Sequence, residues 1–128
     1  MIPATGIYIA ITATIFLVLA VRVIMYRRRK KISLGDDGDK GLLKRMRAHA
    51  NLVEYAPLAL IMLAALEMNG APKALIHVLG LTFVIGRILH AYGFSASPPK
   101  MNLRILGMVL TLGMMAFGIS ALVAASII

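Results

Sequence analysis

The segment Arg47-Ala48-His49-Ala50-Asn51-Leu52-Val53-Glu54-Tyr55-Ala56-Pro57 places charged and polar side chains at the start of a long apolar run. Four of these side chains recur at spacings of i, i+4, i+7 and i+8, so a helix carries them on one face. They are Arg47, Asn51, Glu54 and Tyr55. Because hydrocarbon penalises each such group when it is left alone, a polar stripe inside a membrane helix predicts a functional site.

Four long apolar stretches, at about residues 2–26, 42–68, 74–94 and 102–127, are each long enough to cross a bilayer core of about 30 Å. Of the 128 residues, 60% are hydrophobic and only 15% are charged. In a soluble domain, charged residues make up roughly a quarter of the chain. The sequence therefore predicts an all-α polytopic membrane protein with one domain, residues 1–128, folded as a four-transmembrane-helix up-down bundle. Four spans bury little surface between them, so we expect the chain to form oligomers.

The formal net charge is +9, and most Lys and Arg residues lie between Arg22 and Arg47. Under the positive-inside rule, this basic segment places the loop 27–46 in the cytoplasm and the N-terminus outside. The loop 95–103 then returns to the cytoplasmic side. We expect a multi-pass membrane protein whose basic residues contact membrane lipids, and we do not expect nucleic acid as a partner.

The residue types exclude several classes of site. There are no Cys residues, so disulfides, iron–sulfur clusters and zinc-thiolate sites are excluded, and a thiol used in any reaction must come from a substrate. We predict no metal site, because His49, His77 and His90 lie far apart in sequence and in expected depth. His77 is expected to be packed or interfacial. The three aspartates of the segment 36–39 lack the spacing and the closing Glu of an EF-hand, which favours a solvated loop.

The unusual polar residues share the cytoplasmic end of the predicted bundle. The stripe opens the second span, the third span ends with Arg87, His90 and Phe94, and Arg104 lies in the first turn of the fourth, where we expect Asn102 to cap the helix. We infer a polar pocket in the inner leaflet, open to the cytosol and walled by apolar helices. The alternative is interhelical hydrogen bonding without a ligand, but several arginines for one carboxylate favour the pocket.

The charges of this pocket indicate its ligand. Three cations, Arg47, Arg87 and Arg104, face one carboxylate, Glu54, which complements a small ligand with more carboxylates than amines. An apolar wall beside them suits a lipophilic second reactant. A nearby arginine would also stabilise a substrate thiolate and lower the pKa of the thiol.

These features resemble the MAPEG family, the membrane-associated proteins of eicosanoid and glutathione metabolism, and in particular a bacterial-type microsomal glutathione transferase. The resemblance rests on the motif Arg47-x-His49-x-Asn51-x-x-Glu54-Tyr55-x-Pro57, on Arg87-x-x-His90-x-x-x-Phe94 and on Arg104. The length and the four-span layout agree as well, so the resemblance covers nearly the whole chain.

The resemblance implies a protein of a bacterial inner membrane and a homotrimer that binds glutathione between adjacent subunits near the cytosolic face. By similarity, Arg47 would hold a glutathione carboxylate, Asn51 would bind near the cysteinyl part and Glu54 would take the γ-glutamyl amine. Tyr55 would add a hydrogen bond, and Arg104, the predicted catalytic residue, would stabilise the thiolate. The predicted glutathione-binding residues are Arg47, His49, Asn51, Glu54, Tyr55, Arg87, His90 and Phe94.

The resemblance implies a glutathione transferase or peroxidase that conjugates lipophilic electrophiles or reduces lipid hydroperoxides. Leukotriene-synthase-like members carry tyrosines where this chain has His90 and Phe94, so a non-catalytic lipid-binding protein is the alternative. A small multidrug exporter is a third reading. In such exporters, the first span typically carries a carboxylate that couples transport to protons. The first span of this chain has no carboxylate.

Overall fold

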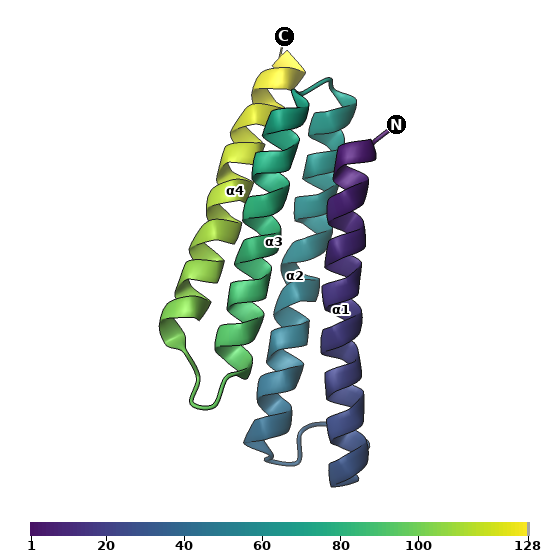
Figure 1. The fold of residues 1–128 in the computed structure, drawn as a ribbon, viewed down its shortest axis with the longest axis vertical. Coiled ribbons are helices and arrows are strands. Elements are labelled where there is room, and N and C mark those ends of the chain that lie inside the picture. Colours follow the sequence, from purple (N-terminus) through teal and green to yellow (C-terminus); the bar gives the residue numbers. More distant parts are fainter. Residues whose placement is uncertain (128) are drawn as a thin grey trace.

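Four antiparallel helices, connected by short loops, make up the computed structural model, which describes residues 1–127 (Figure 1). The helices are α1 (Pro3–Lys30), α2 (Lys40–Met68), α3 (Lys73–Ser95) and α4 (Met101–Ile127). All four are long and apolar enough to cross a membrane. The predicted all-α class with four spans is therefore confirmed.

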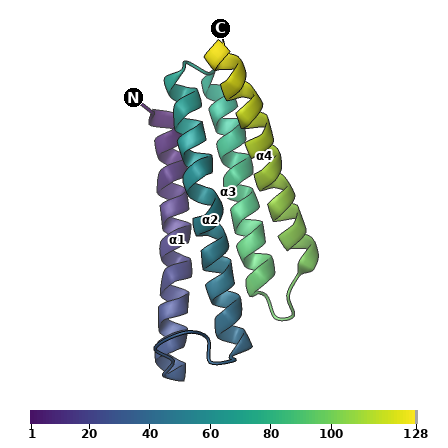
Figure 2. The same cartoon turned by 180° about the vertical axis from the view of Figure 1, so that it is seen from behind.

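The helix pair α2 and α3 forms the centre of the bundle. Helix α1 packs against both of them from one side and α4 packs against both from the other, while α1 and α4 do not contact each other. Figures 1 and 2 show α4 diverging from α2 toward the loop that joins α3 to α4. Leu63, Ile76 and Phe83 are fully buried in the core between the helices. Many large apolar side chains on the outer faces are exposed, as lipid-facing surfaces require.

Two helix ends differ from those that the sequence predicts. Helix α1 continues through the basic cluster to Lys30, where Arg and Lys in the last turn complement the helix dipole. The prediction that Asn102 caps the fourth helix is wrong, because α4 already begins at Met101. The backbone N–H of Arg104 donates to the carbonyl of Lys100 at 3.3 Å, so the hydrogen-bond ladder starts before Asn102 is reached.

The end of the bundle that carries the N-terminus holds two polar contacts. The carboxylate of Glu67, near the end of α2, accepts the backbone N–H groups of Ala4 and Thr5 at 2.9 and 2.7 Å. Both N–H groups lie in the first turn of α1, where a helix has no partners of its own. The hydroxyl of Tyr8 lies 2.9 Å from Nδ1 of His77. His77 is therefore packed against α1, as the sequence predicts.

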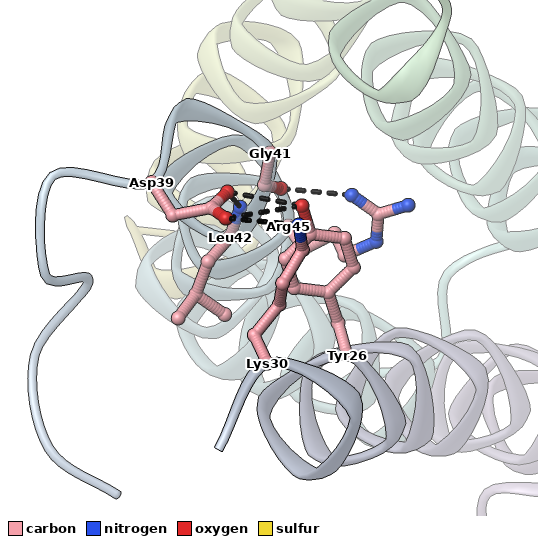
Figure 3. A network of polar contacts seen from close by, with 6 residues as sticks. All are labelled: Tyr26, Lys30, Asp39, Gly41, Leu42 and Arg45. Carbon is pink, nitrogen blue, oxygen red and sulfur yellow. Dashed lines mark hydrogen bonds and ion pairs between the residues drawn. The ribbon is translucent and has the colours of Figure 1, made fainter. Parts of the chain in front are cut away.

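At the opposite end, Asp39 ties α1 to α2 (Figure 3). Its carboxylate caps α2 by accepting the backbone N–H of Leu42 at 2.9 Å, and it also accepts the hydroxyl of Tyr26 at 3.0 Å. The amine of Lys30 lies 3.9 Å away, and the guanidinium of Arg45 lies 4.1 Å from the centre of the Tyr26 ring. The hydrogen bond from Leu42 is the main reason that the pKa of Asp39 lies below its usual range.

Candidate functional site

The centre of the site is Arg87, whose side chain on α3 joins α2 to α4. The residue is only 2% exposed. Its Nε–H donates to Oγ1 of Thr111 at 2.9 Å, and Nη1 donates to Oδ1 of Asn51. Nη2 donates to the carbonyl of Gly107 at 3.3 Å and to the sulfur of Met108 at 3.4 Å. One guanidinium therefore contacts both neighbouring helices in the same layer of the bundle.

Two glycines allow α3 and α4 to approach closely at this layer. A Cβ atom on Gly86 would lie 2.9 Å from both the carbonyl oxygen of Gly107 and Oγ1 of Thr111. A Cβ atom on Gly107 would lie 2.7 Å from the backbone nitrogen of His90. Real Cβ atoms do not occur at such distances, so only glycine brings Thr111 and the Gly107 carbonyl within reach of Arg87.

The polar stripe of α2 divides into two parts. Asn51 and Tyr55 face α3, since Asn51 accepts from Arg87 and the Tyr55 ring lies 5.4 Å from the Arg87 guanidinium. Arg47 and Glu54 form an ion pair of 3.7 Å on the open face of the helix. Their side chains are 50% and 52% exposed, so both remain available to a ligand or to another chain.

Arg104 lies at the edge of a cavity between α3 and α4. Its guanidinium is 3.9 Å from the centre of the Phe94 ring, and that ring lies 5.7 Å from the ring of His90. The Nε atom of Arg104 is buried without a hydrogen-bond partner in residues 1–127. The cavity has a volume of about 250 Å³, and its lining consists of His90, Met101, Arg104, Ile105, Met108, Val109 and Leu112. A cation thus meets an apolar wall.

The predicted site residues do not all touch one another. Within residues 1–127, no hydrogen bond or ion pair connects Arg104 to Asn51 or Glu54, although Met108 both contacts Arg87 and lines the Arg104 cavity. His49 packs against α1, with its ring 4.8 Å from that of Phe16. No cluster of three potential metal ligands occurs in the part of the chain that the structure describes.

Sequence reasoning missed Thr111, which is completely buried and holds Arg87. A signal for it exists: it lies seven residues after Arg104, on the same face of a span that carries no charged residue after Arg104. A buried hydroxyl in that position needs partners, and here it donates to the carbonyl of Gly107 at 2.8 Å and accepts from Arg87.

The chain is also similar in sequence to known proteins. A model of the MAPEG family matches residues 5–124, which include all the predicted site residues. The chain is 32% identical over 90 residues to the inner membrane protein YecN of Escherichia coli (strain K12), covering 70% of this chain and 69% of that protein. The inner membrane protein YecN of Escherichia coli O6:H1 (strain CFT073) matches with the same identity and coverage.

Proposed function

Since this chain belongs to the MAPEG family, we propose that it is a membrane-embedded enzyme that conjugates glutathione to lipophilic electrophiles. The sequence-based recognition of the family is confirmed by the match over residues 5–124. Relatives that are inner membrane proteins support an inner-membrane location for this chain. The basic end of α1 supports an orientation with the N-terminus outside and both the 27–46 and 95–103 loops in the cytoplasm.

The observation that carries the proposal is the cavity of about 250 Å³ in which Arg104 and the buried His90 meet an apolar wall of α4. A thiolate needs a cation beside it, and a lipophilic electrophile needs an apolar surface that is continuous with the membrane. This cavity offers both within one small volume. It also lies at the end of the bundle that the positive-inside rule assigns to the cytosol, where glutathione is available.

The α2 residues fit glutathione in charge. Glutathione carries two carboxylates and one amine, and the open face of α2 offers Arg47 as a cation and Glu54 as an anion. Their ion pair is half exposed, so a carboxylate of the ligand can approach Arg47 while its amine approaches Glu54. Asn51 lies one helical turn after Arg47 and adds an amide group to this site. The amide oxygen accepts a hydrogen bond from Arg87.

The chemistry assigned to Arg104 is electrostatic. Its guanidinium favours the ionised thiol, and the released proton goes to water at the cytosolic opening. Glutathione supplies the nucleophile: its sulfur forms the new bond to the electrophilic carbon, and the leaving group departs with the bonding electron pair. With a lipid hydroperoxide, the same sulfur would attack the terminal oxygen and cleave the O–O bond, giving the sulfenic acid of glutathione and an alkoxide that takes a proton from water to become the alcohol. A second glutathione then displaces the hydroxyl group from that sulfur, which yields glutathione disulfide and water.

The Arg47–Glu54 pair also supports assembly. Two charges that are half exposed on one face of a membrane helix are costly against hydrocarbon, and a second copy of the chain would cover them. We therefore propose that the open face of α2 meets a neighbouring subunit. The resemblance to the MAPEG family implies that this assembly is a homotrimer with glutathione held between adjacent subunits.

Turnover of a reactive aryl halide with glutathione, measured on the protein in lipid vesicles, tests the proposal. We expect the wild type to be active and Arg104→Ala to lose about a hundredfold, as when one charge-stabilising donor is removed. Lys100→Ala is the matched control, because it removes a cation four residues earlier that contacts Tyr92 and does not line the Arg104 cavity. Equal rates for Arg104→Ala and Lys100→Ala would contradict the proposed role.

One observation favours a second candidate, a lipid-binding protein without catalysis. The ring of Phe94 lies on the guanidinium of Arg104 at 3.9 Å and offers no hydroxyl to a bound thiol. This candidate predicts binding of lipid with no turnover of aryl halides or lipid hydroperoxides in the wild type. Turnover that depends on Glu54 would exclude it.

A further inference from the structure

We infer that Arg87 and Thr111 are positioning residues that hold the Asn51 amide so that its nitrogen donates to the bound ligand. This inference rests on the proposed function, because the ligand in question is glutathione. It assigns a task to two buried residues on two helices, neither of which lies on the open face of α2.

The guanidinium of Arg87 is a buried cation. Among the described residues, no Asp or Glu forms an ion pair with this buried guanidinium, whose partners are neutral oxygens, a sulfur and the face of the Tyr55 ring. Buried charges in proteins are usually paired, since an unpaired ion is costly to remove from water. An uncompensated cation at this depth favours an anionic ligand beside it.

The Asn51 amide is held in one orientation by Arg87. A guanidinium has donors only, so the atom of Asn51 that contacts Arg87 is the amide oxygen, and this contact fixes which way the amide points. The amide nitrogen then carries two N–H groups that make no hydrogen bond within residues 1–127. Asn51 is only partly buried, so these two donors are accessible to a ligand atom that accepts hydrogen bonds. A thiolate or a carbonyl oxygen of glutathione fits that requirement.

Thr111 on α4 contacts the other side of the Arg87 guanidinium. Its single hydroxyl proton is used on the carbonyl of Gly107 at 2.8 Å, which leaves an oxygen lone pair for the Nε–H of Arg87 at 2.9 Å. Arg87 is thus held from α4 while it holds Asn51 on α2. Removing this hydroxyl leaves a buried N–H without a partner, and the guanidinium turns to find another. The Asn51 oxygen then loses its fixed donor and the amide is free to rotate.

The experiment compares glutathione affinity, by equilibrium dialysis, for the wild type, Thr111→Val and Thr111→Ser. We expect Thr111→Val to weaken binding by about three- to tenfold, the size of one neutral hydrogen bond, and Thr111→Ser, which keeps the hydroxyl, to restore it. In steady-state kinetics, Thr111→Val should raise KM for glutathione with a smaller change in kcat. Thr82→Val is the matched control, because the hydroxyl of Thr82 bonds only the carbonyl of Val78 within its own helix.

Asn51→Asp separates positioning from general packing. It gives Arg87 a carboxylate partner but removes the amide donors, so we expect unchanged or higher thermal stability together with loss of glutathione binding. A wild type that binds glutathione no more tightly than Thr111→Val does would overturn the positioning role alone. A wild type that binds no glutathione would overturn both this inference and the proposed function. Tight binding by Asn51→Asp would overturn the assignment of the amide as a donor.

Discussion

The carboxylate of Glu67 accepts the backbone N–H of Thr5 at 2.7 Å, so the last turn of α2 caps the first turn of α1. A negative charge at a helix N-terminus also complements the helix dipole. Replacing Glu67 by Gln leaves one acceptor oxygen for two N–H groups and removes the charge. We expect a lower melting temperature in detergent and faster hydrogen exchange at the Ala4 and Thr5 amides. Unchanged exchange at both amides would contradict the capping role.

The other glutamate of α2, Glu54, provides a separate prediction about binding. In the proposed site, its carboxylate accepts the amine of glutathione, and a hydrogen bond to a charged group contributes about 1.5–3 kcal/mol. Glu54→Gln should therefore raise the Kd of glutathione by about ten- to a hundredfold, as measured by equilibrium dialysis, without changing the melting temperature. Glu67→Gln is its control and should show the reverse pattern. An equal loss of affinity in both variants would indicate a general effect on folding.

Asp39 makes the stability of the contact between the end of α1 and the start of α2 depend on pH. Its pKa is lower in the folded chain than in the unfolded one, chiefly because it accepts the N–H of Leu42. Its stabilising contribution is thus present above the unfolded value of about 4 and is lost as the pH falls through the lowered folded value. Melting temperatures at a series of pH values should fall less steeply below about pH 4 for Asp39→Asn, which keeps the cap without titrating. Parallel curves for the two proteins would contradict this account.

Gly86 tests the close contact between α3 and α4. A Cβ atom there would meet the Gly107 carbonyl and the Thr111 hydroxyl at 2.9 Å, so Gly86→Ala should force the helices apart at a cost of about 1–3 kcal/mol. The separation should also weaken glutathione binding, because it moves Thr111 away from Arg87. Gly113→Ala is the control, since nothing lies within 4 Å of its Cβ position. In unfolding experiments in detergent, we expect no destabilisation from Gly113→Ala.

The sequence predicts those features that depend on neighbours along the chain. The four spans follow from long, mostly apolar runs, and the family follows from the motif between Arg47 and Pro57. Contacts between distant residues were not predictable in this way. Thr5 and Glu67 are 62 residues apart, and Arg87 and Thr111 are 24 apart, so their pairing depends on how the helices dock. The expected cap at Asn102 failed for a local reason, because Lys100 already accepts the first helical hydrogen bond of α4.

The sequence also predicted only part of the arrangement of the site residues, for the same reason. Helical spacing put Asn51 and Glu54 on one face, but it did not show that Asn51 contacts α3 while Glu54 stays half exposed. That division depends on the buried guanidinium of Arg87, which draws the nearest amide and ring toward it. His49 belongs to the family motif and was predicted to bind the ligand, but its ring packs on Phe16 of α1.

The most direct test of the central claim is the ultraviolet absorbance of the thiolate when glutathione binds to the protein at neutral pH. We expect a thiolate band with the wild type and its loss with Arg104→Ala at glutathione concentrations that saturate both proteins. Lys100→Ala should keep the band. A band of equal size in Arg104→Ala, or no band in a wild type that binds glutathione, would contradict the claim that this arginine ionises the thiol.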